Sequence, residues 1–138
     1  MFVRTATPDD ALEIRRILDA AMLEPGDIEG RIDAGDIFVA GDHHGMPARE
    51  SSAERILGTV VLEPLADERG AHVGAIGVRR RHRDQGLGRA LIETALEREG
   101  RLTARFDDGV RPFYERLGFS IEPIDEQRYR GLVTIDRA

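Results

Sequence analysis

The chain has 138 residues, of which 41% are apolar, and this size and composition are typical of a single globular domain over residues 1–138. A net charge of -6 argues against a protein that binds nucleic acid. Because cysteine is absent and all 20 basic residues are arginine, disulfides, thiolate metal sites and catalytic lysines are excluded.

The first part of the chain contains a clear helix start. Thr7 is a favoured N-cap, Pro8 suits the first helical position, and apolar residues recur at helical spacing up to about Met22. Residues 41–54 are rich in Gly, His, Pro and charged side chains, so we interpret them as an exposed connection. In chain order, this part predicts a strand, a helix, a short helix and a strand over residues 2–6, 7–22, 28–34 and 37–40.

The second part predicts more strands than helices. In chain order these are strands over 56–62 and 72–78, a helix over 86–99, a strand over 102–106, a short helix ending at Leu117, and a hairpin of strands over 119–124 and 131–135. Three consecutive strands in the middle of the chain suggest an antiparallel meander, and the strand–helix–strand unit from 72 to 106 suits a right-handed parallel crossover. We therefore expect an α/β fold with a mixed sheet flanked by helices.

The segment Arg83-Asp84-Gln85-Gly86-Leu87-Gly88 joins a predicted strand to a predicted helix. Its glycines allow a tight turn and close approach of a ligand, and amides at a helix N-terminus bind phosphate or pyrophosphate. The dinucleotide pattern GxGxxG lacks its third glycine here, and a Walker A loop needs a lysine. Four arginines among residues 79–83 add local positive charge, and we interpret this run as steering the phosphates of the ligand. The alternative is an ordinary glycine-rich turn beside a solvated arginine cluster.

This segment resembles the main cofactor motif of the GNAT N-acetyltransferase superfamily, R/Q-x-x-G-x-G/A, in the form Arg83-x-x-Gly86-x-Gly88. The segment from Arg111 to Phe119 is similar to the family's closing Phe-Tyr-Glu-Lys-Leu-Gly-Phe segment. The opening strand and helix, residues 3–10, agree as well. Together these segments order the chain from residue 2 to about 136 as the family does.

The resemblance implies a GNAT-like fold: a mostly antiparallel sheet in which one parallel pair of strands, 72–78 and 102–106, splays apart around the pantetheine arm of acetyl-CoA. Acetyl-CoA would be the co-substrate, and no metal is expected. Family members often carry Asn where this chain has Asp107, but Asp can still cap the following helix. The implied cofactor-binding residues are Ile76, Gly77, Val78, Arg83, Asp84, Gln85, Gly86, Leu87, Gly88, Arg89 and Asp107.

The family transfers the acetyl group directly to an amine, and the resemblance assigns two catalytic roles. Tyr114 matches the tyrosine that protonates the leaving thiolate, although its ring could instead simply pack the short helix. His72 is our candidate base because it lies six residues before Val78 with the same strand parity; the alternative is an ordinary strand histidine. Glu63 and Glu24 are the fallback bases.

The resemblance to the family also predicts the partners of the protein. We expect an amine acceptor, a small molecule or a protein amine, bound near residues 22–36 and the strands around 56–72. Acids in that region either attract a cationic amine or form a solvated helix face: Glu24, Asp27, Glu29, Asp33 and Asp36. We expect a cytoplasmic protein with no membrane or nucleic-acid partner, and a homodimer is possible for this fold. The alternative function is a non-catalytic acyl-CoA-binding or regulatory module.

Overall fold

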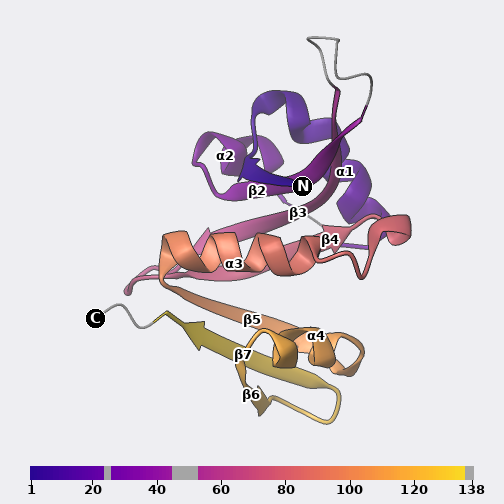
Figure 1. Ribbon diagram of the computed structural model, residues 1–138. Helices are drawn as coiled ribbons and strands as arrows, with labels where there is room; N and C mark the ends of the chain where they lie inside the picture. Colours follow the sequence, from indigo (N-terminus) through magenta and orange to yellow (C-terminus); the bar gives the residue numbers. More distant parts are fainter. Residues whose placement is uncertain (24–25, 45–52, 136–138) are drawn as a thin grey trace.

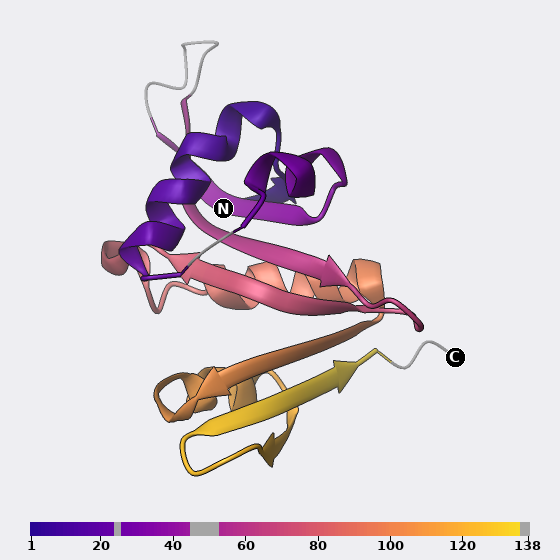
Figure 2. The ribbon, with the colours of Figure 1, turned by 180° about the vertical axis from the view of Figure 1, so that it is seen from behind.

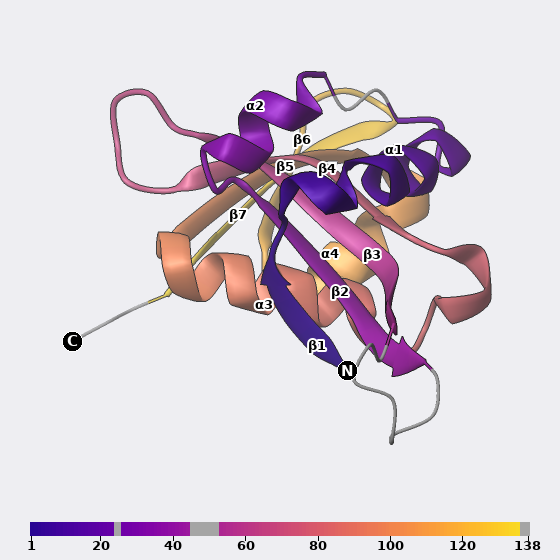
Figure 3. The same cartoon turned by 90° about the horizontal axis from the view of Figure 1, so that it is seen from above.

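The computed structural model describes residues 1–23, 26–44 and 53–135. Its centre is a seven-stranded sheet in the order β1-β2-β3-β4-β5-β7-β6, with helices on both faces (Figure 1, Figure 3). The strands are β1 (Phe2–Thr5), β2 (Ile37–His44), β3 (Ala53–Pro64), β4 (Ala71–Val78), β5 (Arg101–Asp107), β6 (Ser120–Pro123) and β7 (Arg128–Thr134).

The helices are short. They are α1 (Ala11–Ala20), α2 (Ile28–Asp33), α3 (Leu87–Glu99) and α4 (Arg111–Arg116), with single 3-10 turns η1 (Pro8–Asp10), η2 (Arg80–His82) and η3 (Asp108–Val110). Gly100 ends α3 in the left-handed region at φ 81°, as expected for a glycine that closes a helix. None of the described helices is long and apolar enough to cross a membrane.

The strand pairing confirms the expected fold class. Neighbouring strands pair antiparallel throughout, except for the parallel pair β4/β5. The meander β2-β3-β4, the crossover from β4 through α3 to β5, and the final hairpin β6/β7 are all present. The sheet is therefore mixed, with its single parallel pair near the middle.

Two apolar cores lie on opposite faces of the sheet. Leu91, Ile92 and Ala95 of α3 pack on one face, together with aromatic residues from the α4 end of the molecule. Ile14 and Leu18 of α1 pack on the other face, with the isoleucines of α2. Figure 2 shows that α1 and α2 lie over the β1–β4 half only, and the described chain places no helix over β5, β7 and β6 on that side. We call this uncovered side of β5, β7 and β6 the open face.

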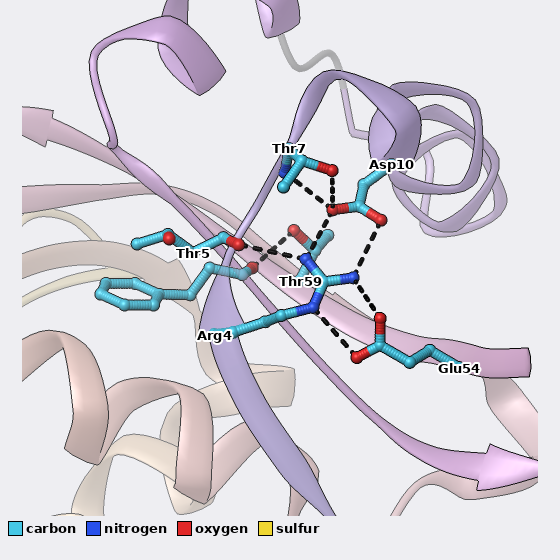
Figure 4. A network of polar contacts seen from close by, with 7 residues as sticks. Arg4, Thr5, Thr7, Asp10, Glu54 and Thr59 are labelled. Atoms are coloured by element: carbon cyan, nitrogen blue, oxygen red, sulfur yellow. Dashed lines mark hydrogen bonds and ion pairs between the residues drawn. The ribbon is translucent and has the colours of Figure 1, made fainter. Parts of the chain in front are cut away.

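A polar network ties the first strand to the start of α1 (Figure 4). The Asp10 carboxylate accepts hydrogen bonds from the Thr7 backbone amide at 2.8 Å and from the Arg4 guanidinium at 2.8 and 3.1 Å. Arg4 also donates to both oxygens of Glu54 on β3. The predicted helix start at Thr7 is thus confirmed, and Asp10 satisfies an amide that the helix leaves unpaired.

A bulge at Gly74 divides β4 into two parts. Val61 of β3 pairs with Ala75, whereas the next residue, Leu62, pairs with Val73, so Gly74 is the extra residue. Side chains on β4 therefore change faces at this point: Val73 packs in the α3 core and Ala75 in the α1 core. Such bulges bend a strand and increase its twist.

The expected exposed connection over 41–54 is wrong at both ends. β2 continues to His44 and β3 begins at Ala53, because the strands pair across this polar stretch in the register Asp42–Arg55. The Arg55 guanidinium donates to both oxygens of Asp42, at 2.7 and 2.9 Å. The remainder of the connection, 45–52, lies outside the described residues. β7 also begins three residues earlier than predicted, since Arg128 pairs with Asp107 of β5.

Candidate active site

The parallel strands β4 and β5 separate almost as soon as they meet. Only two residue pairs, Ala71–Leu102 and His72–Thr103, are in register. The bulge at Gly74 follows directly, and beyond it a groove of about 1230 Å³ opens between the strands. Small-molecule pockets are typically ~300–1,000 Å³, so this groove suits a long ligand.

Most of the predicted cofactor residues line this one groove. They are Ile76, Gly77, Val78, Arg83, Asp84, Gly86, Leu87, Gly88, Arg89 and Asp107, together with Tyr114. Gln85 and His72 do not line it; the Gln85 side chain instead lies 3.4 Å from His82 Nδ1.

The loop before α3 leaves a row of backbone amides without acceptors. Asp84 and Gly86 adopt the left-handed region at φ 66° and 86°, and the first helical bond is donated by Ala90 to the Gly86 carbonyl. Within the described chain, none of the amides from Asp84 to Arg89 donates to another residue. These donors lie at the positive end of the α3 dipole, so the loop fits an anion such as a pyrophosphate.

The two glycines of the loop serve different purposes. A Cβ on Gly86 would meet no atom within 4 Å, so this side of the loop is open to a ligand. A Cβ on Gly88 would lie 3.0 Å from the Phe113 ring, so this glycine lets α3 and α4 pack closely. The aromatic neighbour of Gly88 could not be identified from the sequence, because the contact joins residues far apart in the chain.

The arginine run before the loop is only partly directed at the groove. Arg79 forms an ion pair with Glu13 and donates to the Ile56 carbonyl, so it fastens β4 to α1 and β3. Of its four arginines only Arg83 lines the groove, next to His82 of the same run, and Arg89 joins them from the first turn of α3. The expectation that the whole run from 79 to 83 serves a ligand is therefore too broad.

Tyr114 lies on α4 with its ring inside an aromatic cluster. The ring stacks on Phe106 at a centroid distance of 4.3 Å and meets Phe113 and Phe119 edge to face. Only 4% of the residue is exposed, and this burial raises the pKa of the phenol to about 12. The hydroxyl has no hydrogen-bond partner within the described residues, but it is not shut away from solvent. Because Tyr114 lines the groove, the hydroxyl faces the groove. The packing role is thus present, and the proton-donor role stays a prediction.

His72 lies where β4 and β5 still pair, at the end of the groove. Because the bulge intervenes, His72 faces the opposite side of the sheet from Val78, and the expected shared parity is wrong. Its Nδ1 atom lies 2.8 Å from the Thr103 hydroxyl. Burial is the main cause that lowers the pKa of His72; Arg105 acts in the same direction, and Glu63 opposes them.

Glu63 is the cross-strand partner of His72. Its carboxylate lies over Gly74, since a Cβ on that glycine would stand 2.6 Å from Glu63 Oε2. Gly74 itself lines the groove, so Glu63 reaches the groove edge. The other fallback base, Glu24, lies outside the described residues.

Asp107 performs the capping role expected for it. Its carboxylate accepts a hydrogen bond of 2.9 Å from the Gly109 amide at the start of η3. It also lines the groove. Whether Asp107 contacts the co-substrate stays a prediction.

The acids expected near the acceptor largely have partners in the chain. Asp27 caps α2 through the Gly30 amide, and Glu29 pairs with Arg15. Asp36 lies near Arg98 and Arg31, at 3.7 and 3.9 Å, while burial raises the pKa of its carboxyl. These contacts favour structural roles over attraction of a cationic amine.

Sequence reasoning missed Arg105, which lines the groove from β5. The signal was present in the alternation of β5, because Leu102, Ala104 and Phe106 are buried and the residues between them face outward. That pattern identifies an outward arginine, but only the pairing of β4 with β5 places it beside the groove.

Comparison with known proteins places the chain in a family. A family profile described as "Acetyltransferase (GNAT) domain" matches residues 33–121. The chain belongs to the GNAT acetyltransferase family, as its sequence motifs indicated. No curated protein sequence matches it significantly.

Several solved structures share the fold. A GNAT-family acetyltransferase from Listeria monocytogenes has 16% identity and a TM-score of 0.69, with 97% of this chain and 94% of that chain covered. An aminoglycoside 6'-N-acetyltransferase complexed with coenzyme A has 13% identity and a TM-score of 0.77, with coverage of 100% and 99%. An N-acetylglutamate synthase from Neisseria gonorrhoeae, complexed with coenzyme A and L-arginine, has 15% identity and a TM-score of 0.75, with coverage of 99% and 33%.

Proposed function

We propose that this chain is an N-acetyltransferase that transfers an acetyl group from acetyl-CoA directly to an amine in the groove between β4 and β5. The observation that carries the proposal is the row of unpaired amides at the α3 N-terminus, opening onto the same groove as the Tyr114 hydroxyl. Two of the structural neighbours described above were solved with coenzyme A, which supports the choice of co-substrate.

The backbone of this chain would hold the co-substrate. Beyond the bulge, β4 no longer pairs with β5, so Ile76 and Val78 have backbone groups on that edge that can bond an extended pantetheine arm. The amides from Asp84 to Arg89 would bind the pyrophosphate; the Arg83 amide, predicted to join them, donates to the Arg80 carbonyl instead. The side chains of Arg83 and Arg89 would add positive charge. When bound, acetyl-CoA supplies the acetyl group as an activated thioester.

Tyr114 would act on the leaving sulfur. A phenol with a pKa of about 12 is protonated at any physiological pH, so it can donate a hydrogen bond. Tyr114 would therefore stabilise the developing thiolate by a hydrogen bond and then donate its proton to the sulfur.

The attacking amine must lose a proton, and His72 with Glu63 would take it. Both side chains lie on the sheet face opposite α3, at the closed end of the groove. Burial and Arg105 keep the pKa of His72 low, so its imidazole is neutral and able to accept a proton at neutral pH.

The test is release of free thiol from acetyl-CoA in the presence of a panel of primary amines, followed by mass detection of the acetylated product. Amine-dependent release that requires folded protein supports the proposal. A protein that binds acetyl-CoA and releases no thiol with any amine would be the non-catalytic binding module instead.

A further inference from the structure

We infer that the acceptor is an amine that also carries a carboxylate, and that Arg105 binds this carboxylate. The inference rests on the proposed function and names the substrate class of the same site.

Arg105 stands on the open face, beside the groove. The buried residues Ala104 and Phe106 on either side of it point into the α3 core, so Arg105 projects to the opposite side. Figure 2 shows this side of β5 without a helix above it. Because Arg105 also lines the groove, a second substrate can reach it from the open face while the first occupies the phosphate loop on the α3 side.

Among the residues that the structure describes, no side chain pairs with the positive charge of Arg105. Its cross-strand partner on β7 is Arg130, and like charges directly opposite in an antiparallel pair are destabilising. Within the described residues Arg105 forms no ion pair, and the nearby Asp107 carboxylate is engaged by the Gly109 amide. An arginine left in this position fits the binding of an anion from outside the chain.

The groups next to Arg105 complement an amine. The His72 imidazole contacts Thr103, which lies two residues before Arg105 on the same face of β5, and Glu63 pairs with His72 across the strands. His72 thus lies between a strand that carries a guanidinium and a strand that carries a carboxylate. This arrangement matches a ligand with a carboxylate at one position and an amino group at another.

An alternative role for Arg105 is contact with the phosphates of the co-substrate. The phosphate-binding loop is formed at the N-terminus of α3, whereas Arg105 projects from the sheet face that α3 does not cover. Three of the five acids expected near the acceptor, Asp27, Glu29 and Asp36, are already engaged by groups of the chain. Charge on this side of the groove therefore favours an acceptor with a negative group.

The test compares amines that differ only in the carboxylate. The twenty L-amino acids are assayed beside their carboxamides and their decarboxylated amines, by thiol release with saturating acetyl-CoA. The best acceptor is then assayed with Arg105→Gln, and with Arg130→Gln as the matched control, since Arg130 carries the same charge directly opposite but does not line the groove. Calorimetric titration of acetyl-CoA accompanies each variant.

We expect amino acids to be accepted in preference to their carboxamides and amines. Arg105→Gln should raise the KM for the amino acid by roughly 10- to 100-fold and leave acetyl-CoA binding unchanged, and Arg130→Gln should change the KM by about threefold or less. Equal rates with the uncharged analogues, or a loss of acetyl-CoA affinity in Arg105→Gln, would overturn the inference. A wild-type protein that binds no acetyl-CoA would instead refute the proposed function itself.

Discussion

Replacing Tyr114 by phenylalanine removes one hydroxyl group and keeps the aromatic packing around it. The ring contacts with Phe106, Phe113 and Phe119 involve carbon atoms that both side chains share. The hydroxyl has no partner among the described residues. We therefore expect the free energy of unfolding to change by no more than ~0.5 kcal/mol.

The effect on catalysis should be much larger. A hydrogen-bond donor aimed at developing charge is worth about 10²–10³ in kcat, and Tyr114 is the donor that the structure directs into the groove from α4. Because the pKa of Tyr114 is about 12, its hydroxyl stays protonated across the working range. A fall in rate at pH 8–10 should thus not come from this residue.

The assay is steady-state thiol release, with acetyl-CoA affinity measured separately by calorimetry. The chain has two tyrosines, and the second, Tyr129, does not line the groove, so Tyr129→Phe is the matched control. We expect kcat to fall about 100-fold or more in Tyr114→Phe only, with acetyl-CoA affinity unchanged in both variants. A kcat within about threefold of wild type in Tyr114→Phe would remove Tyr114 from the mechanism.

Three further predictions concern pH and packing. Burial raises the pKa of Asp10, but hydrogen bonds from Arg4 and Thr7 lower it below its ordinary value; stability from this carboxylate should be complete above pH ~4 and lost below it. In urea unfolding, Asp10→Asn should lower the free energy of unfolding by ~1–3 kcal/mol at pH 7. The variant should also lose less stability than the wild type when the pH falls below ~4. With His72 as the base, kcat/KM should fall as the pH drops through the lowered pKa of His72. The same fall of kcat/KM at acid pH in His72→Gln would contradict that role. Gly88→Ala should lower stability by ~1–3 kcal/mol in thermal unfolding, because its methyl meets the Phe113 ring, and adding Phe113→Leu should recover part of the loss.

The elements that local patterns define were predictable. The helix start at Thr7 and the glycine that ends α3 each depend on residues close together in the chain. The glycine loop before α3 belongs to this group, because its glycines and the helix that follows are contiguous. The family motif predicts phosphate binding for this loop.

What could not be predicted depends on pairing between distant segments. The bulge at Gly74 arises from the register of β3 against β4, and it turns His72 to the face opposite Val78. The strands extend through polar residues because Asp42 and Arg55 meet across the sheet. Arg79 belongs to the run that we predicted to steer phosphates, but it forms an ion pair with Glu13 instead.

The proposed function depends on binding of the acetyl-CoA pyrophosphate by the loop from Asp84 to Arg89. Calorimetric titration with acetyl-CoA, beside NADH and ATP, on wild type, Gly86→Glu and Gly118→Glu tests it most directly. Both glycines have φ 86° and open space at Cβ, so each substitution introduces the same strain and charge, but only Gly86 lines the groove. We predict selective binding of acetyl-CoA that weakens at least ~10-fold, or ~1.4 kcal/mol, in Gly86→Glu and persists in Gly118→Glu. No binding to the wild type, or equal binding by all three proteins, would contradict the account.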